Sequence, residues 1–182
     1  MRKLVLLALS TVAQIGVSFG ATTWFVNGTV GRDWYSGAVM TPKRTIQAAI
    51  DAASNGDTVL IAGGTYNENL RLSKNLTLHA YEPQTVKVDG RHAGSCLCIN
   101  DGAAGCVIDG ITFTHGAPTN SGNKYGGGIN CHANATIRHC AFIDNGNSST
   151  TFAGGLHTDN GSQVLVQNCL FVGNYAWACG GA

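Results

Sequence analysis

Charged side chains are scarce in this chain. Asp, Glu, Lys and Arg make up only 12% of the 182 residues, and the formal net charge at pH 7 is +1. A surface with so little net charge has no field that would hold nucleic acid or an anionic membrane. Beyond the first twenty residues there is also no apolar run of the ~20 residues that a membrane-spanning helix needs. We therefore expect no nucleic-acid partner and no transmembrane segment in the mature chain.

The chain also lacks the spacings of common metal sites and acid pairs. Cys131-His132 and His139-Cys140 are adjacent pairs rather than the spaced pairs that bind zinc. No three acids lie in neighbouring segments, as a calcium site would require. The acids of the second half come singly, at Asp101, Asp109, Asp144 and Asp159. We therefore predict no metal and no cofactor, and the sequence alone assigns no catalytic residue.

What the chain has in abundance is internal repetition. Three segments superimpose without a gap, each starting 29 residues after the last: Val107–Phe113, Thr136–Phe142 and Leu165–Phe171. A second signal at nearly the same spacing consists of glycine runs at 126–128, 154–155 and 180–181. Fixed self-similarity of this length, with short apolar β-type runs and glycine-marked corners, is typical of a solenoid in which each repeat is one turn.

Equivalent positions of the repeat should form columns along such a solenoid. Three columns are apolar: Ile108/Ile137/Val166, Ile111/Cys140/Cys169 and Phe113/Phe142/Phe171. A small or polar column lies between the first two: Gly110/His139/Asn168. We expect the three phenylalanines to stack as one inward-facing column in the core.

The first twenty residues have the features of an export signal. Basic residues Arg2-Lys3 precede an apolar run, Leu4–Val17, and the small residues Ser18 and Gly20 come just before Ala21. The apolar run is too short to span a bilayer. We therefore predict a signal peptide over residues 1–20 and a secreted protein, extracellular or held at the cell surface.

A short amphipathic helix is predicted ahead of the repeats. In residues 45–54 the apolar side chains recur at helical spacing, at Ile46, Ala49, Ile50 and Ala53. Thr45 can cap the start of this helix and Gly56 can end it. Residues 57–66 then read as a strand and a turn. Such a helix would cover the first edge of an open stack of strands.

Seven cysteines in an exported chain raise the question of disulfides. Cys140 and Cys169 share a column of adjacent turns, so their Cα atoms should lie roughly 4.8 Å apart, within disulfide range. They are equally compatible with small apolar fillers stacked in the core. Cys96 and Cys98 are poorly placed to bond each other. Both interpretations of the first pair stay open.

The opening of the chain contains five characteristic segments: Trp24–Asn27, Gly31–Gly37, Thr45–Ala53, Gly56–Val59 and Gly63–Glu68. With them the chain resembles secreted bacterial right-handed parallel β-helix proteins of the pectin-lyase-like superfamily. The resemblance implies an all-β fold with three parallel sheets wound around one core and polar ladders at the corners. The column Gly110/His139/Asn168 sits where such proteins often stack asparagines.

The resemblance raises the possibility of a polysaccharide lyase. Such an enzyme neutralises a sugar carboxylate, commonly with Ca²⁺, and removes the neighbouring proton with a Lys or Arg base. Asp109, Arg138 and Gln167 should form one outward row, which is either half of such a site or an exposed ion pair. Lys124 is an alternative base. The closely set Asp pairs of pectin esterases and polygalacturonases find no match.

A binding or scaffold role requires fewer specific residues than a lyase does, and it is our main interpretation. Several aromatic side chains could stack on sugar rings: Trp34, Tyr35, Tyr125, Tyr175 and Trp177. We interpret the chain as an exported, carbohydrate-associated or cell-surface module with a polysaccharide or surface glycan as partner. The alternative is a polysaccharide lyase with part of its catalytic face missing, in which Ca²⁺ would be the cofactor.

The predicted organisation has three parts. They are the signal peptide (1–20), an N-terminal strand with the capping helix (21–56) and β-helix turns (57–182). The last four residues, Cys179 to Ala182, begin another glycine corner without a covering element. Because terminal solenoid turns need capping, we expect the β-helix to be truncated at this end.

Overall fold

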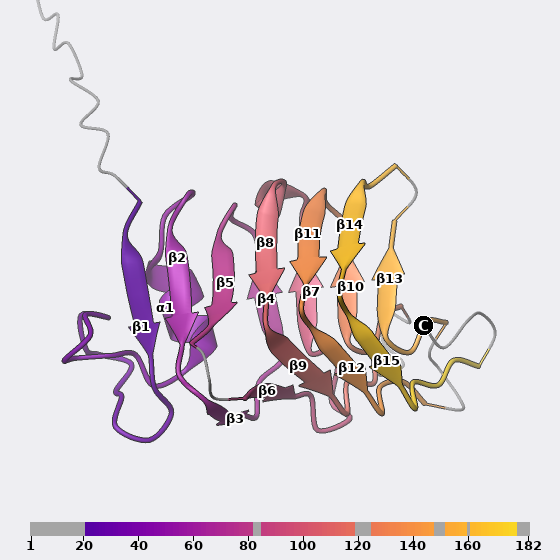
Figure 1. The fold of residues 1–182 in the computed structure, drawn as a ribbon, viewed down its shortest axis with the longest axis horizontal. Helices are drawn as coiled ribbons and strands as arrows, with labels where there is room; N and C mark the ends of the chain where they lie inside the picture. Colours follow the sequence, from indigo (N-terminus) through magenta and orange to yellow (C-terminus); the bar gives the residue numbers. More distant parts are fainter. Residues whose placement is uncertain (1–20, 82–84, 119–124, 148–151, 160, 178–182) are drawn as a thin grey trace, which may run out of the picture.

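The computed structural model describes residues 21–81, 85–118, 125–147, 152–159 and 161–177. Within them the chain winds into a solenoid of short parallel strands that stack along the long axis of the molecule, with one α-helix at the N-terminal end (Figure 1). The predicted all-β parallel β-helix is confirmed. The signal peptide, Lys124 and Cys179 to Ala182 lie outside the described residues.

Three parallel sheets form the walls of the solenoid. The six-stranded sheet has the order β1 (Thr23–Val26), β2 (Thr58–Ile61), β5 (Thr77–Ala80), β8 (Cys106–Asp109), β11 (Ala135–Arg138) and β14 (Val164–Gln167). The five-stranded sheet has the order β15 (Leu170–Val172), β12 (Ala141–Ile143), β9 (Ile111–Thr114), β6 (Val86–Asp89) and β3 (Gly64–Tyr66). The four-stranded sheet has the order β13 (Leu156–Thr158), β10 (Ile129–Cys131), β7 (Leu97–Ile99) and β4 (Leu70–Leu72).

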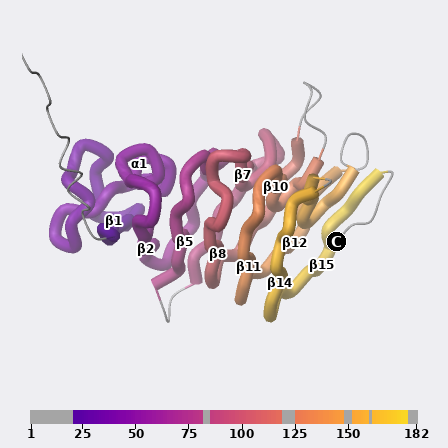
Figure 2. The backbone as a smooth tube through the Cα atoms, turned by 90° about the horizontal axis from the view of Figure 1, so that it is seen from above, coloured from indigo at the N-terminus to yellow at the C-terminus, as the bar shows by residue number. Residues whose placement is uncertain are grey.

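Each turn visits the three sheets in the same sequence. The chain runs from β8 through β9 and β10 to β11, where the next turn begins, and successive turns lie side by side (Figure 2). A short 3₁₀ helix, Asp101–Ala103, connects β7 and β8. No helix of the described part is long and apolar enough to cross a membrane.

The 29-residue register is confirmed by the strand pairing. Val107 pairs with Thr136 and Thr136 pairs with Leu165 across the six-stranded sheet. In the core, the ring centroids of Phe113 and Phe142 are 5.5 Å apart, and those of Phe142 and Phe171 are 4.6 Å apart with nearly parallel planes. The predicted phenylalanine column therefore exists. It stacks one ring per turn.

The polar column between the apolar ones has a different role from the one expected. Gly110, His139 and Asn168 each have positive φ, at 76°, 52° and 51°, and each is the first residue of the short corner between the six-stranded and five-stranded sheets. Gly adopts this left-handed conformation without strain, and Asn tolerates it better than most residues. This column is therefore a backbone corner, and the expected asparagine ladder lies elsewhere.

The asparagine ladder lies at the corner that follows the five-stranded sheet. Asn145 is fully buried, and its Nδ2 donates to the Phe113 carbonyl and to Asn174 Oδ1. Its Oδ1 accepts from the Gly116 amide. Asn174 repeats the pattern by donating to the Phe142 carbonyl. Because these bonds satisfy buried backbone groups from one turn to the next, they hold consecutive corners together.

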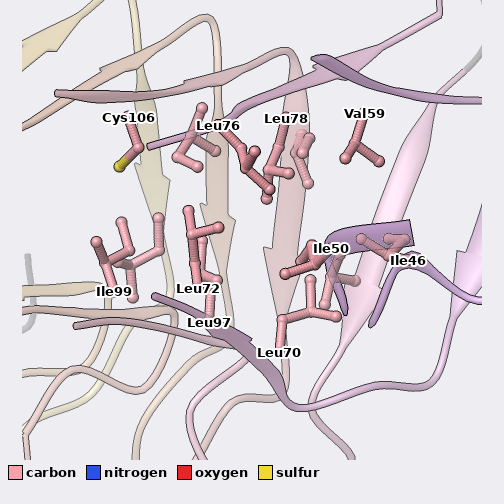
Figure 3. Close-up of a cluster of buried hydrophobic side chains, with 14 of the residues drawn as sticks. Ile46, Ile50, Val59, Leu70, Leu72, Leu76, Leu78, Leu97, Ile99 and Cys106 are labelled. Atoms are coloured by element: carbon pink, nitrogen blue, oxygen red, sulfur yellow. The ribbon is translucent and has the colours of Figure 1, made fainter. Parts of the chain in front are cut away.

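The N-terminal helix α1 (Ile46–Ala52) covers the first turn as predicted. Ile46 and Ile50 point into a cluster with Val59 and Leu70 (Figure 3), and all four side chains are buried. The Thr45 side chain accepts from the Ala48 amide, which confirms the N-cap.

The C-terminal end of the helix differs from the prediction. Ala53 occupies the C-cap position, and Gly56, with φ of 90°, lies in the following turn instead. The Lys74 ammonium donates to the carbonyls of Ile50, Asp51 and Ala53. A cation from the neighbouring turn therefore satisfies the last carbonyls of α1 in place of a glycine motif.

Six cysteines lie in the described residues, and all of them are free thiols. Cys140 and Cys169 occupy the shared column, where Cys140 Sγ lies 3.2 Å from the Arg138 carbonyl. Burial raises the pKa of the Cys140 thiol to about 12. Of the two interpretations of this pair, the structure has the stacked fillers.

Candidate functional site

The predicted outward row on the six-stranded sheet exists, and it is a closed ionic cluster. Asp109, Arg138 and Gln167 are in register on β8, β11 and β14. Arg138 Nε and Nη2 each lie 3.0 Å from Asp109 Oδ2. Two histidines that the sequence analysis did not connect with Asp109 complete its surroundings: His139 Nδ1 at 2.9 Å and His79 Nδ1 at 3.3 Å.

The Asp109 cluster has the electrostatics of a structural ion pair. Burial raises the pKa of Asp109, but the hydrogen bonds from His139 and Arg138 and the nearby cations outweigh it, so the net pKa is lowered. Both carboxylate oxygens are occupied, and the side chain is 10% exposed. Arg138 is therefore held by Asp109 and is not positioned to act as a base, which favours the ion-pair interpretation of this row.

The aromatic residues expected to stack on sugars fall into separate places. Trp34 and Tyr35 form an edge-to-face pair in the loop after β1, with centroids 6.2 Å apart. Tyr175 is about half exposed in the segment after β15. Tyr125 and Trp177 belong instead to a cluster beside the four-stranded sheet. The lyase candidate Lys124 lies outside the described residues.

Three aromatic side chains form a shelf at the corner that leads into the four-stranded sheet. We call Tyr125, Phe152 and Trp177 the aromatic shelf. Tyr125 and Phe152 are stacked with centroids 5.2 Å apart, and Phe152 meets Trp177 edge to face at 6.5 Å. Trp177 is 63% exposed and Tyr125 39% exposed. The shelf therefore presents ring surface to solvent next to β10 and β13.

Polar side chains line the outward face of the four-stranded sheet beside this shelf. In register across β4, β7, β10 and β13 stand Arg71, Cys98, Asn130 and His157. Two residues further along each strand, past its end, come Ser73, Asn100, His132 and Asp159. We call these eight residues the polar rows. A hollow of about 360 Å³ at their β4 end is lined by Arg71 and Ser73, together with Lys74 and residues of α1.

Four members of the polar rows form one hydrogen-bonded chain. His132 Nδ1 lies 2.5 Å from Asp159 Oδ2, and His132 Nε2 lies 2.9 Å from Asn130 Nδ2. Asn130 Oδ1 lies 3.0 Å from His157 Nδ1. Tyr125 of the shelf stacks on the His157 ring with centroids 4.5 Å apart. The chain therefore links a half-exposed carboxylate to a ring that touches the shelf.

His157 titrates differently from an ordinary histidine. Burial is the largest influence and lowers the pKa of the ring, and the Asp159 carboxylate raises it by less. Because the net pKa is lowered, His157 is neutral at pH 7. A neutral imidazole offers one donor and one acceptor nitrogen, so it can bind a hydroxyl group or move a proton.

Sequence reasoning missed this site because its members follow a spacing of 27 residues. The pairs Tyr125/Phe152, Asn130/His157 and His132/Asp159 are each separated by 27 positions. The glycine runs at 126–128 and 154–155 carry the same offset, so aligning the chain on them would have brought these residues together. In the described residues no group of three or more His, Cys, Asp or Glu is placed to hold a metal ion.

The fold and this face together define a pectin-lyase-like parallel β-helix protein. Residues 29–176 match the family described as "Protein of unknown function (DUF1565)", and the chain belongs to that family. A segment is also 37% identical over 68 residues to "Pectate lyase PEL9" of Emericella nidulans. That match covers 33% of this chain and 17% of the fungal enzyme, and no solved structure matches the chain.

Proposed function

We propose that this protein is an exported β-helix module, extracellular or at the cell surface, that binds a polysaccharide along the outward face of the four-stranded sheet. The observation that carries the proposal is the juxtaposition of the aromatic shelf with the polar rows. Sugar rings have apolar faces that stack on aromatic side chains and hydroxyl groups that hydrogen bond to amides, imidazoles and carboxylates. Both kinds of partner lie side by side on β10 and β13.

The geometry of the face suits an extended chain molecule. Four parallel strands at a spacing of ~4.8 Å place Arg71 and His157 roughly 14 Å apart across the sheet. Between them stand Cys98 and Asn130. A linear glycan lying across the strands would meet one outward side chain per turn. The relation to a pectate lyase supports a polysaccharide as the class of ligand.

Affinity electrophoresis of the full chain in gels containing single polysaccharides tests the proposal. We expect at least one polysaccharide to retard the wild type, and we expect Tyr125→Ala and Trp177→Ala to abolish the retardation, because each removes stacking surface. Trp34→Ala is the matched control, since Trp34 is also an exposed aromatic residue, at 79%, but lies in the loop after β1. Retardation lost equally in all three variants, or absent with every polysaccharide, would reject the proposal.

The second candidate function is a polysaccharide lyase acting by β-elimination on uronic acids, favoured by the similarity to pectate lyase PEL9. Arg138, one of its two candidate bases, is engaged by Asp109 in the described structure. We therefore expect purified residues 21–182 to produce no unsaturated sugar ends from pectate or alginate, with or without Ca²⁺. A steady rise in ultraviolet absorbance that disappears in Lys124→Ala or Arg138→Ala would replace the binding proposal with the lyase.

A further inference from the structure

The hydrogen-bonded chain on the four-stranded sheet has a defined direction. A carboxylate can only accept, so His132 Nδ1 carries the proton it shares with Asp159 Oδ2. The other nitrogen of a neutral His132, Nε2, then accepts from Asn130 Nδ2. The remaining amide atom, Asn130 Oδ1, accepts from His157 Nδ1. All three of these hydrogen bonds are satisfied by this one arrangement of protons.

The direction of the chain determines what His157 offers to a ligand. With its proton on Nδ1, the ring has an unprotonated acceptor nitrogen at Nε2. Within the described parts of the chain no group hydrogen bonds to His157 Nε2, and the side chain is 22% exposed. The ring face is covered by Tyr125. His157 Nε2 is therefore the end of the chain that is open to a bound sugar.

Protonation of His132 would reverse the chain. A proton on His132 Nε2 would face the Asn130 NH₂ group, and two donors cannot bond each other. Turning the Asn130 amide over places Oδ1 against His132 and Nδ2 against His157. His157 Nδ1 must then accept, so the proton of this neutral ring moves to Nε2. The ligand-facing nitrogen changes from an acceptor into a donor, although His157 itself gains no net charge.

We propose that Asn130 couples the protonation of His132 to the hydrogen-bond polarity of His157 Nε2. The site then accepts a hydrogen bond from a sugar hydroxyl at neutral pH and donates one to a sugar carboxylate in acid. The identity of the ligand rests on the proposed function, whereas the coupling between the two histidines does not. Asn130 acts as a positioning residue, and His157 is the group that touches the ligand.

The two histidines differ in their contact with Asp159. His132 Nδ1 contacts the Asp159 carboxylate directly, at 2.5 Å. His157 is 3.8 Å from Asp159, and burial lowers its pKa. The other titratable groups facing the pair from the described elements are the Tyr125 phenol, the Cys98 thiol on β7 and Arg71 on β4. The Arg71 cation lies two strands away from Asn130.

Nitrogen-15 spectra of histidine side chains in the full chain test the coupling. At about pH 8, above the usual histidine range, we expect both His132 and His157 in the Nδ1–H tautomer. On acidification, His132 should gain a second proton while His157 changes to the Nε2–H tautomer with the same midpoint. In His132→Gln the change at His157 should disappear. His79→Gln, on the six-stranded sheet, is the control and should leave it intact.

The wild-type spectra alone can overturn the coupling. His157 in the Nε2–H tautomer at about pH 8 would contradict it whether or not any variant folds. A tautomer change that survives in His132→Gln with an unchanged midpoint would contradict it as well. Thermal melting of each variant shows that the fold is retained.

Binding of trigalacturonate and of its carboxyl-reduced counterpart tests the second part of the proposal, that the site donates a hydrogen bond to a sugar carboxylate in acid. Between about pH 7.5 and pH 5.5 we expect the preference for the carboxylate sugar to rise roughly tenfold in the wild type, as a new charge-assisted bond would give. In His132→Gln the rise should be less than about twofold. Failure of both sugars to bind at any pH rejects an oligogalacturonate as the ligand, the gel assay decides the proposed function, and the spectra still decide the coupling. If the preference of the wild type for the carboxylate sugar does not change with pH, this second part of the proposal is rejected.

Discussion

Two outward faces of the same solenoid each carry an aspartate surrounded by histidines, yet they differ in what they leave open. On the six-stranded sheet, Asp109 receives Arg138, His139 and His79, and its side chain is 10% exposed. On the four-stranded sheet, Asp159 is 45% exposed and contacts His132 as the first member of a chain that ends at His157, whose Nε2 has no hydrogen-bond partner among the described residues. The first cluster is closed and the second is open.

The difference shows how similar residues form a closed ion pair in one place and a partly exposed hydrogen-bonded chain in another. Around Asp109 a cation and two rings converge on one carboxylate, so the charges neutralise each other where they stand. Along the Asp159 chain the contacts run in sequence from Asp159 through His132 and Asn130 to His157, and we propose that a change at His132 alters the hydrogen-bonding state of His157. Beside the open chain, Tyr125 stacks on both Phe152 and His157.

The largest expected effect is on the core that both faces share. Phe142 is fully buried between Phe113 and Phe171. Truncating Phe142 to Ala should cost roughly 3–5 kcal/mol of unfolding free energy, because the cavity interrupts the ring column. Chemical denaturation followed by circular dichroism measures this cost. A loss below about 1 kcal/mol would mean that the column does not support the stack.

The next effect separates the two aspartates. Asp109→Asn leaves Arg138 and two histidines around a weaker acceptor and should destabilise the protein by roughly 2 kcal/mol. Asp159→Asn should cost less than about 0.5 kcal/mol, because Asp159 is exposed to solvent. Denaturation of the two variants side by side measures the difference. Equal costs would remove the distinction between a closed and an open cluster.

A smaller effect concerns pH. The folded pKa of Asp109 is lowered from the ordinary value of 3.8, so the folded state binds fewer protons than the unfolded chain in acid. The contribution of Asp109 to stability is fully present above pH 3.8 and is lost as the pH falls through the lowered pKa of the folded state. The difference in unfolding free energy between the wild type and Asp109→Asn should therefore become smaller below pH 3.8. Urea titrations at a series of pH values measure it, and a gap that widens in acid would contradict this sign.

The sequence was sufficient for the walls of the solenoid and for the row of Asp109 and Arg138, but not for the two histidines that complete the closed cluster. The 29-residue period predicted the pairing of Asp109 with Arg138 and the stacking of Phe142, because in-register parallel strands convert equal spacing into contact. The capping helix followed from its apolar spacing. The corners were harder, since Gly110/His139/Asn168 and Asn145/Asn174 have the same period and only the backbone conformation distinguishes them.

The open site could not be predicted from the same period. The turns differ in length before the four-stranded sheet, so Asn130 meets His157 after 27 residues rather than 29. His79 likewise joins Asp109 from an earlier turn that lies outside the repeat. Such contacts depend on loop lengths and on side-chain direction, and the spacing of apolar residues predicts neither.

The central claim is that the four-stranded face binds the ligand and the six-stranded face does not. Amide chemical-shift mapping of the full chain, titrated with an oligosaccharide of the polysaccharide that retards it, tests this most directly. We predict shifts concentrated in β10, β13 and the aromatic shelf, with the amides of β8 and β11 unchanged. Shifts concentrated around Asp109 and Arg138 on β8 and β11 would contradict the account.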